Sequence, residues 1–175
     1  MKTAEEQLAT YKSVHLNKRN IATHFIGVPS IIWSLALLLS LYRFPVTFDQ
    51  IEIALTPAKL FFGLTLIYYL MLHWKLALGL LLFIIPVVYT ADLVAQYEHA
   101  LFIAVAVFIV AWIIQFIGHH FEKAKPAFVD DLNQLLIGPF FLMAEVYFML
   151  GLEKSLEKAI TPMAVEKRRA LENKR

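Results

Sequence analysis

Apolar stretches almost free of charge alternate with short polar segments along this chain. Four of them, at 25–42, 57–72, 76–91 and 100–118, approach the roughly 20 residues that a helix needs to cross a ~30 Å hydrocarbon core. The second stretch is short, and Lys59 near its start can extend its amine toward water. The pattern therefore predicts four membrane-spanning helices.

A fifth apolar stretch, at 135–152, differs from the others. Gly138 and Pro139 interrupt it, and Glu145 lies inside it. A charged side chain within the bilayer is costly unless it is paired or functional. We therefore expect either a broken helix or a re-entrant hairpin here, a segment that dips into the membrane and does not cross it.

Polar, helix-forming segments flank the predicted bundle. Residues 1–22 predict an interfacial helix, and residues 153–175 predict a charged cytosolic tail. The chain is then expected to be one all-α domain, an integral membrane helical bundle formed by residues 23–152. No apolar core of a signal peptide precedes the first stretch, which would itself direct insertion.

The placement of lysine and arginine predicts the orientation of the bundle. If both termini share a side with the 73–75 and 119–134 connections, every basic residue except Arg43 and Lys59 lies on that side. Basic residues concentrate on the cytosolic side of membrane proteins. We therefore expect a multi-pass protein with both termini cytosolic, in a bacterial inner membrane or, in a eukaryote, in the endoplasmic reticulum.

Composition agrees with this interpretation and excludes several kinds of site. Hydrophobic residues make up 59% of the chain and charged residues 17%, whereas soluble domains have about half and a quarter. Because the chain has no cysteine, disulfides, thiolate zinc sites and iron–sulfur clusters are excluded. The net charge of +2 says little about nucleic acid, but the lack of a basic patch argues against it. The basic tail suits a lipid bilayer instead.

The histidines carry the candidate chemistry. Although they are scattered along the sequence, five of the six fall at the cytosolic mouth of the predicted bundle, and only His99 falls at the other. Imidazole is a poor lipid-facing group and a good ligand for a transition metal. The pattern therefore suggests a site at the water–lipid boundary. The five residues are His15, His24, His73, His119 and His120.

The first motif is Tyr11-x3-His15-x4-Asn20-x3-His24. On one straight helix, His15 and His24 would point to opposite faces, so both can bind one metal only if the chain breaks between them. The segment from Asn17 to Asn20 is a plausible place, because asparagine favours caps and turns. Asn20 could also orient the ring of His24 through a hydrogen bond. Histidines lying beside lipid head groups remain an alternative.

The second motif is Gln115-x2-Gly118-His119-His120-x-Glu122. His119 and Glu122 are i,i+3 neighbours, so an imidazole and a carboxylate project from one helix face, as they do in metal-binding helical bundles. Gly118 would let another backbone or a substrate approach closely. The alternative is a helix end in which Glu122 pairs with the lysines that follow it.

The remaining polar residues are weaker candidates. His73 sits beside Trp74 and Lys75, where a turn at the membrane interface explains it. His120 points about 100° away from His119 on a helix, so the two are not expected to share a role. Glu145 either supports a histidine or keeps its segment from crossing.

Together the two motifs resemble a family of small multi-span membrane proteins, long catalogued as a domain of unknown function, that includes the iron(II)-dependent 2-hydroxy fatty acid dioxygenase of the endoplasmic reticulum. The resemblance extends from about residue 8 to residue 150. In some members one more residue separates the second-motif histidine from the glutamate. The matching residues are Tyr11, His15, Asn20, His24, Pro29, Gln115, Phe116, Gly118, His119, Glu122, Pro126, Ala127 and Pro139.

The resemblance implies a metal-dependent oxidation in which O₂ shortens a long-chain 2-hydroxy fatty acid by one carbon. It implies iron(II) as the cofactor. The state of assembly, including a homo-oligomer, is left open. His24, His119 and Glu122 would form the catalytic centre. The expected metal ligands are His15, His24, His119 and Glu122, with His120 and His73 ranking after them. The residues expected to support the ligands are Asn20, Tyr11, Gln115 and Glu145. Lys123 and Lys125 would attract the substrate carboxylate.

Two other function classes fit the same residues. A zinc-dependent membrane lipid hydrolase would use the ligands to activate water rather than O₂. A non-catalytic protein that organises lipids would carry interfacial histidines without a stoichiometric metal. Metal identity and dependence on O₂ separate the three.

Overall fold

The computed structural model describes residues 2–48 and 51–173. Over these ranges the chain forms seven α-helices, one short 3-10 helix and one β-hairpin. In chain order the elements are α1 (Ala4–Lys12), α2 (Lys18–Ser40), β1 (Phe44–Phe48), β2 (Ile51–Leu55), α3 (Pro57–Leu72), α4 (Trp74–Val94), α5 (Ala100–Glu122), η1 (Ala127–Val129), α6 (Gln134–Met149) and α7 (Lys154–Glu172).

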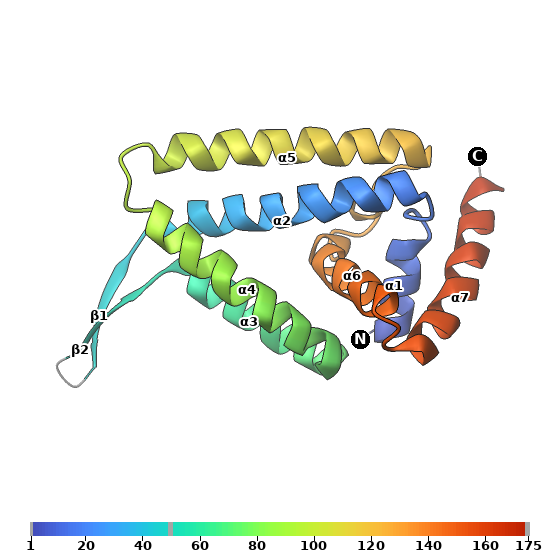
Figure 1. Ribbon diagram of the computed structural model, residues 1–175, viewed down its shortest axis with the longest axis horizontal. Helices are drawn as coiled ribbons and strands as arrows, with labels where there is room; N and C mark the ends of the chain where they lie inside the picture. The colour runs from blue at the N-terminus through green and yellow to red at the C-terminus, as the bar shows by residue number, and fades with distance from the viewer. Residues whose placement is uncertain (1, 49–50, 174–175) are drawn as a thin grey trace.

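Helices α2 and α5 lie side by side and antiparallel (Figure 1). Each has 23 residues, about 35 Å at ~1.5 Å per residue, which is enough to cross a bilayer. Small buried residues recur on α5 at Ala104, Ala111 and Gly118. A Cβ atom at Gly118 would collide with the side chains of Thr23 and Asn20 on α2. The small residues therefore let the two backbones approach closely.

Helices α3 and α4 form a tight helical hairpin that packs obliquely against α2 (Figure 1). His73 ends α3 and caps the start of α4. Within the described ranges, α2, α4 and α5 are the three helices long and apolar enough to cross a membrane. Helices α3 and α6 are apolar but have 16 residues each, about 24 Å. A fourth crossing by α3 therefore stays a prediction.

The break or re-entrant hairpin expected at Gly138 and Pro139 is wrong, because α6 is one continuous helix. Pro139 lies in the second turn of α6, where its ring removes a single intrahelical hydrogen bond. Gly138 serves packing instead, since a Cβ atom there would lie 3.1 Å from the hydroxyl of Tyr11. Phe140 and Phe141 are fully buried, and burial of this kind stabilises the helix despite its proline.

The connection between α2 and α3 is a β-hairpin. Strands β1 and β2 pair antiparallel, with Phe44 opposite Leu55 and Val46 opposite Ile53. β-Branched and aromatic residues, which favour strands, are frequent in both segments. The hairpin projects from the end of the molecule opposite both termini (Figure 1).

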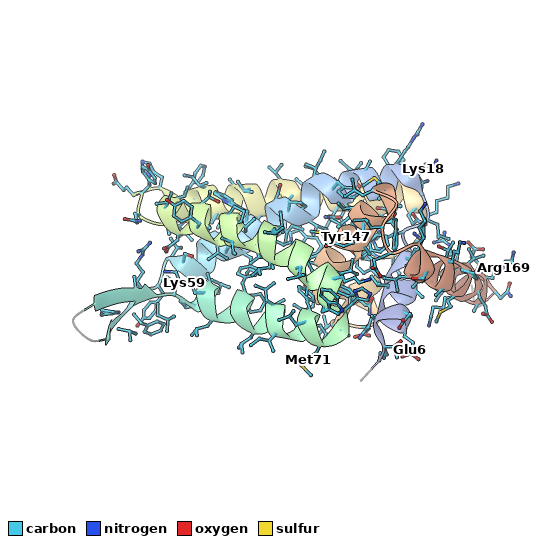
Figure 2. All side chains as sticks on the ribbon, turned by 60° about the horizontal axis from the view of Figure 1, so that its bottom comes forward. Glu6, Lys18, Lys59, Met71, Tyr147 and Arg169 are labelled. Carbon is cyan, nitrogen blue, oxygen red and sulfur yellow. The ribbon has the colours of Figure 1, made fainter. Side chains whose placement is uncertain are left out.

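Both termini lie at one end of the molecule, where α1 and α7 pack together (Figure 1). Figure 2 shows Lys18 and Arg169 at this end and Lys59 near the hairpin. The charge asymmetry of the sequence is thus an asymmetry between the two ends of the fold. The single interfacial helix expected over residues 1–22 is divided, because α1 ends at Lys12 and Asn17 caps the start of α2.

The acidic residue inside the fifth apolar stretch has its partner on α1. The carboxylate of Glu145 accepts a hydrogen bond from Lys12 Nζ at 2.5 Å, and the two side chains are only 15% and 12% exposed. Lys12 Nζ also lies 5.7 Å from the ring centroid of Phe141. Glu145 therefore joins α6 to α1 through a partly buried ion pair.

We predict that reporters fused to the two termini will be found on the same side of the membrane, and that a reporter inserted in the β-hairpin will be found on the other. The reason is the shared end of the termini together with the concentration of basic residues there. Protease protection in oriented vesicles measures this. Opposite accessibility of the two termini would contradict the arrangement.

We predict that Glu145→Ala lowers the free energy of unfolding by about 1–3 kcal/mol, because it leaves the Lys12 ammonium poorly solvated and unpaired. Chemical unfolding in detergent micelles measures the change. The control is Asp130→Ala, which breaks an ion pair of Lys125 whose side chains are 57% and 55% exposed and should cost at most about 0.5 kcal/mol. Equal effects of the two substitutions would show that the buried pair contributes nothing special.

Candidate metal centre

Three histidines from separate parts of the chain meet inside the bundle. His15 comes from the α1–α2 connection, His24 from the second turn of α2, and His119 from the last turn of α5. One ring nitrogen from each lies within 4.8 Å of the others. The side chains are 1%, 2% and 9% exposed. The structure thus gathers three buried imidazoles at the end of the molecule that holds both termini.

The break in the chain before α2 makes this grouping possible. Ser13 caps the end of α1, and the side chain of Asn17 accepts a hydrogen bond from Arg19 N at 2.9 Å to begin α2. Between these caps the chain turns, and Nε2 of His15 lies 3.0 Å from Nε2 of His24. An interruption before His24 is therefore present, but it lies earlier than the predicted segment from Asn17 to Asn20, because α2 already begins at Lys18.

Backbone carbonyls determine which nitrogen of two rings carries the proton. His15 Nδ1 lies 2.7 Å from the carbonyl oxygen of Tyr11, and His24 Nδ1 lies 2.8 Å from that of Asn20. A carbonyl oxygen only accepts, so in both rings Nδ1 carries the hydrogen and donates it. In the neutral rings Nε2 then bears a lone pair. Two lone pairs face one another across 3.0 Å.

This arrangement fits a cation. Burial lowers the pKa of His15 well below its usual value, and the neighbouring His24 and His119 lower it further, so a proton is a poor occupant. For metal–nitrogen bonds of ~2.0–2.1 Å, two nitrogens at roughly right angles about a metal would be about 3 Å apart, which is the separation of the Nε2 atoms of His15 and His24. The rings also meet edge to face, at interplanar angles of 80°, 71° and 82°. They are neutral donors suited to a divalent transition metal.

Tyr11 and Asn20 hold the first two rings in place. The ring of Tyr11 stacks on His15 with centroids 4.1 Å apart and planes within 2°, and burial raises the pKa of its hydroxyl. The side chain of Asn20 donates to the carbonyl oxygen of Val14 and to Glu122. The contact that orients His24 therefore comes from the backbone carbonyl of Asn20 and not from its side chain.

Glu122 does not belong to the group of three histidines, although the sequence placed it among the ligands. Its carboxylate accepts hydrogen bonds from the backbone amides of Leu16 and Asn17 at 3.1 and 2.8 Å, and from the side chain of Asn20 at 3.1 Å. Arg168 Nη1 donates to it from 3.3 Å. Glu122 therefore ties the end of α5 to the connection that carries His15.

Sequence reasoning treated Arg168 only as one basic residue of the tail. In the structure it also donates to the carbonyl oxygen of Glu122 at 3.0 Å. The available signal was a stripe along α7, in which Leu156, Ile160 and Ala164 are buried at intervals of four residues. Arg168 is the next position on that stripe.

The other candidates lie apart from the three histidines. His73 pairs with Glu153 at 3.3 Å, and His120 is exposed. Lys125 forms an ion pair with Asp130 at 2.6 Å, and Lys123 ends α5 in a left-handed conformation. Attraction of a substrate by the charge of these lysines stays a prediction.

A cavity of about 80 Å³ adjoins the histidines. It lies between α2, α5, η1 and α6, and among the described residues that line it none is a lysine, arginine, aspartate or glutamate. Beyond the histidines its wall is mainly apolar and includes Val28, Ile32 and Trp112. Gln115 also lines it, one helical turn before His119.

Comparison with known proteins agrees with the resemblance carried by the two motifs. Residues 1–150 match the family described as "2-hydroxy-palmitic acid dioxygenase Mpo1-like". The chain is 32% identical over 161 residues to the 2-hydroxy-palmitic acid dioxygenase MPO1 of Saccharomyces cerevisiae, an alignment that covers 88% of this chain and 85% of the relative. No solved structure matches. The chain belongs to the Mpo1-like 2-hydroxy-palmitic acid dioxygenase family.

Proposed function

We propose that this protein is an iron(II)-dependent dioxygenase that uses O₂ to shorten a long-chain 2-hydroxy fatty acid by one carbon. The observation that carries the proposal is the buried group of three neutral imidazoles in a chain of this family. The reaction balances as the 2-hydroxy acid plus O₂ giving the shorter acid, CO₂ and water. The four electrons that reduce O₂ come from the carboxyl carbon and the carbon bearing the hydroxyl.

We assign His15, His24 and His119 as the ligands. When bound, iron(II) would supply the redox chemistry and the binding of O₂ that no side chain of this protein provides. Three protein ligands leave coordination positions for exogenous groups. The two oxygens of a 2-hydroxy carboxylate form a natural chelating pair for such positions.

The surrounding residues would keep the ligands in place. The carbonyl oxygens of Tyr11 and Asn20 hold Nδ1–H of His15 and His24, which leaves Nε2 of each ring to the metal. Glu122, held by Arg168, keeps the His15 connection against α5. We therefore propose a positioning role for Glu122 in place of direct ligation.

The acyl tail would leave the cavity on its apolar side. A volume of about 80 Å³ accepts a head group and not a long alkyl chain. Val28, Ile32 and Pro139 also line a second, apolar cavity of about 140 Å³ between α2, α4 and α6. The tail would run past these residues toward the lipid, while the head group stays at the end of the bundle that we place in the cytosol.

One observation also favours a zinc-dependent lipid hydrolase. Three histidines with an open position are a known catalytic zinc site, and zinc would activate water in place of O₂. The two functions differ in the bound metal and in whether O₂ is consumed.

We predict that detergent-purified protein contains about one iron per chain, and that His24→Ala and His119→Ala each lose most of it, since two imidazoles hold a metal far more weakly than three. Elemental analysis measures this. The matched control is His120→Ala, which removes the exposed neighbour of His119 and should leave the metal content unchanged. Undiminished metal in both ligand variants would remove the site, and zinc in place of iron would favour the hydrolase.

We predict that iron-loaded protein consumes O₂ only when a long-chain 2-hydroxy acid is present and releases the acid one carbon shorter. An oxygen electrode and mass spectrometry of the product measure this. His119→Ala should lower turnover at least about 100-fold, because changes to groups that merely support ligands cost 10–100-fold. His99→Ala, at the far end of α5, should have little effect. Equal losses in the two variants would mean that activity reports only the integrity of the fold.

A further inference from the structure

The side chain of Gln115 is buried, although its amide group forms no hydrogen bond within the described residues. It is 4% exposed, and neither Nε2 nor Oε1 has a hydrogen-bond partner among the residues that the structure describes. A buried polar group left unpaired costs about 1–3 kcal/mol, so proteins seldom keep one without a reason. Because this side chain carries two such groups, we expect it to have a role beside the histidines.

Gln115 is placed to meet a molecule bound beside the histidines. It precedes His119 by four residues on α5, so both side chains project from the same face of the helix, and both line the cavity. Gly27 on α2 faces it so closely that a Cβ atom there would lie 2.7 Å from Nε2. The amide is therefore packed against α2.

Gln115 has two unpaired side-chain atoms, whereas each other buried side chain of this kind in the described ranges has one: Asn20 Oδ1, Ser40 Oγ, His119 Nδ1 and Gln134 Oε1. Ser40 Oγ is unpaired at the opposite end of α2. Gln134 lines the same cavity but has only its Oε1 unpaired, because its Nε2 donates to Gln7 at 2.9 Å. Gln115 alone keeps both a donor and an acceptor available in the cavity.

The cavity also lacks the cation that a carboxylate would ordinarily meet. Its described lining includes no lysine or arginine, and Lys125 lines a separate cleft beside α7. A carboxylate entering the cavity would have its charge balanced by the metal alone. Its remaining lone pairs would need a neutral donor, and Gln115 Nε2 is available.

We infer that Gln115 binds the head group of the substrate and selects acids that carry a 2-hydroxyl. The inference rests on the proposed function. Its Nε2 donates to the carboxylate, and its Oε1 accepts from the hydroxyl on the adjacent carbon. The carboxamide holds a donor and an acceptor on one carbon, and the substrate presents the complementary pair on neighbouring carbons. A site that hydrogen-bonds a substrate hydroxyl discriminates against the analogue without it.

The test compares Gln115→Leu with the wild type, both loaded with iron(II) and kept anaerobic. Calorimetry measures the affinity for a long-chain 2-hydroxy acid and for the unsubstituted acid of the same length. We expect Gln115→Leu to weaken binding of the 2-hydroxy acid about 10–100-fold and to reduce the preference over the unsubstituted acid. Gln115→Glu, whose charge repels the carboxylate, should weaken it further and serves if the leucine variant does not fold.

Two further measurements separate recognition from a structural role. Metal content should stay at the wild-type level in Gln115→Leu. Its thermal midpoint without ligand should not fall, because the substitution removes unpaired polar groups. The control is Ser40→Ala, at the far end of α2. It should likewise not lower the thermal midpoint, and it should leave substrate binding unchanged.

Binding of the 2-hydroxy acid within about twofold of the wild type in Gln115→Leu would overturn the inference and leave the proposed function standing. Equal losses for both acids, or loss of metal, would also overturn it, since either would mean a role in cavity shape or in holding the ligands. If the iron-loaded wild type binds no 2-hydroxy acid, the proposed function fails first and the inference fails with it.

Discussion

The arrangement of the three histidines depends on the hydrogen bonds that the carboxylate of Glu122 accepts. This carboxylate lies at the end of α5 and accepts hydrogen bonds from the backbone of Leu16 and Asn17, the side chain of Asn20, and Arg168 on α7. At 5% exposure, an unpaired carboxylate would be costly, and several donors compensate its charge. Through this one group the connection that bears His15 is fixed relative to the helix that bears His119.

A site this polar requires close packing in an otherwise apolar bundle. Small residues bring α5 against α2, and Gly118 in particular leaves room for Asn20 and Thr23. The same closeness shields the three imidazoles from water, and they are at most 9% exposed. Except for Ser40 Oγ, the buried side-chain atoms left unpaired in the described residues belong to this region, on Asn20, Gln115, His119 and Gln134. Each such buried polar group that stays unpaired lowers the stability of the fold.

The last helix adds to the part of the chain that the family match covers. The match ends at residue 150, yet α7 packs on α1 and delivers Arg168 to Glu122. The buried stripe of α7 holds the helix in place, while its opposite face remains charged. Residues of α7, outside the family match, therefore help to hold residues inside the match in their conformation.

Sequence by itself determined the apolar helices and the residues worth attention, because hydropathy and local spacing are properties of the chain. The stretches at 76–91 and 100–118 became the central parts of α4 and α5, and the two histidine motifs contain all three clustered imidazoles. Only the tertiary structure decided how these residues meet. Burial of the neighbouring side chains keeps α6 helical despite its proline. Glu145 pairs with Lys12, 133 positions away. The carboxylate of Glu122 accepts hydrogen bonds from backbone amides and from an arginine that no local pattern connects to it. Such pairings depend on which helices pack together, and helical periodicity carries no information about partners distant in the chain.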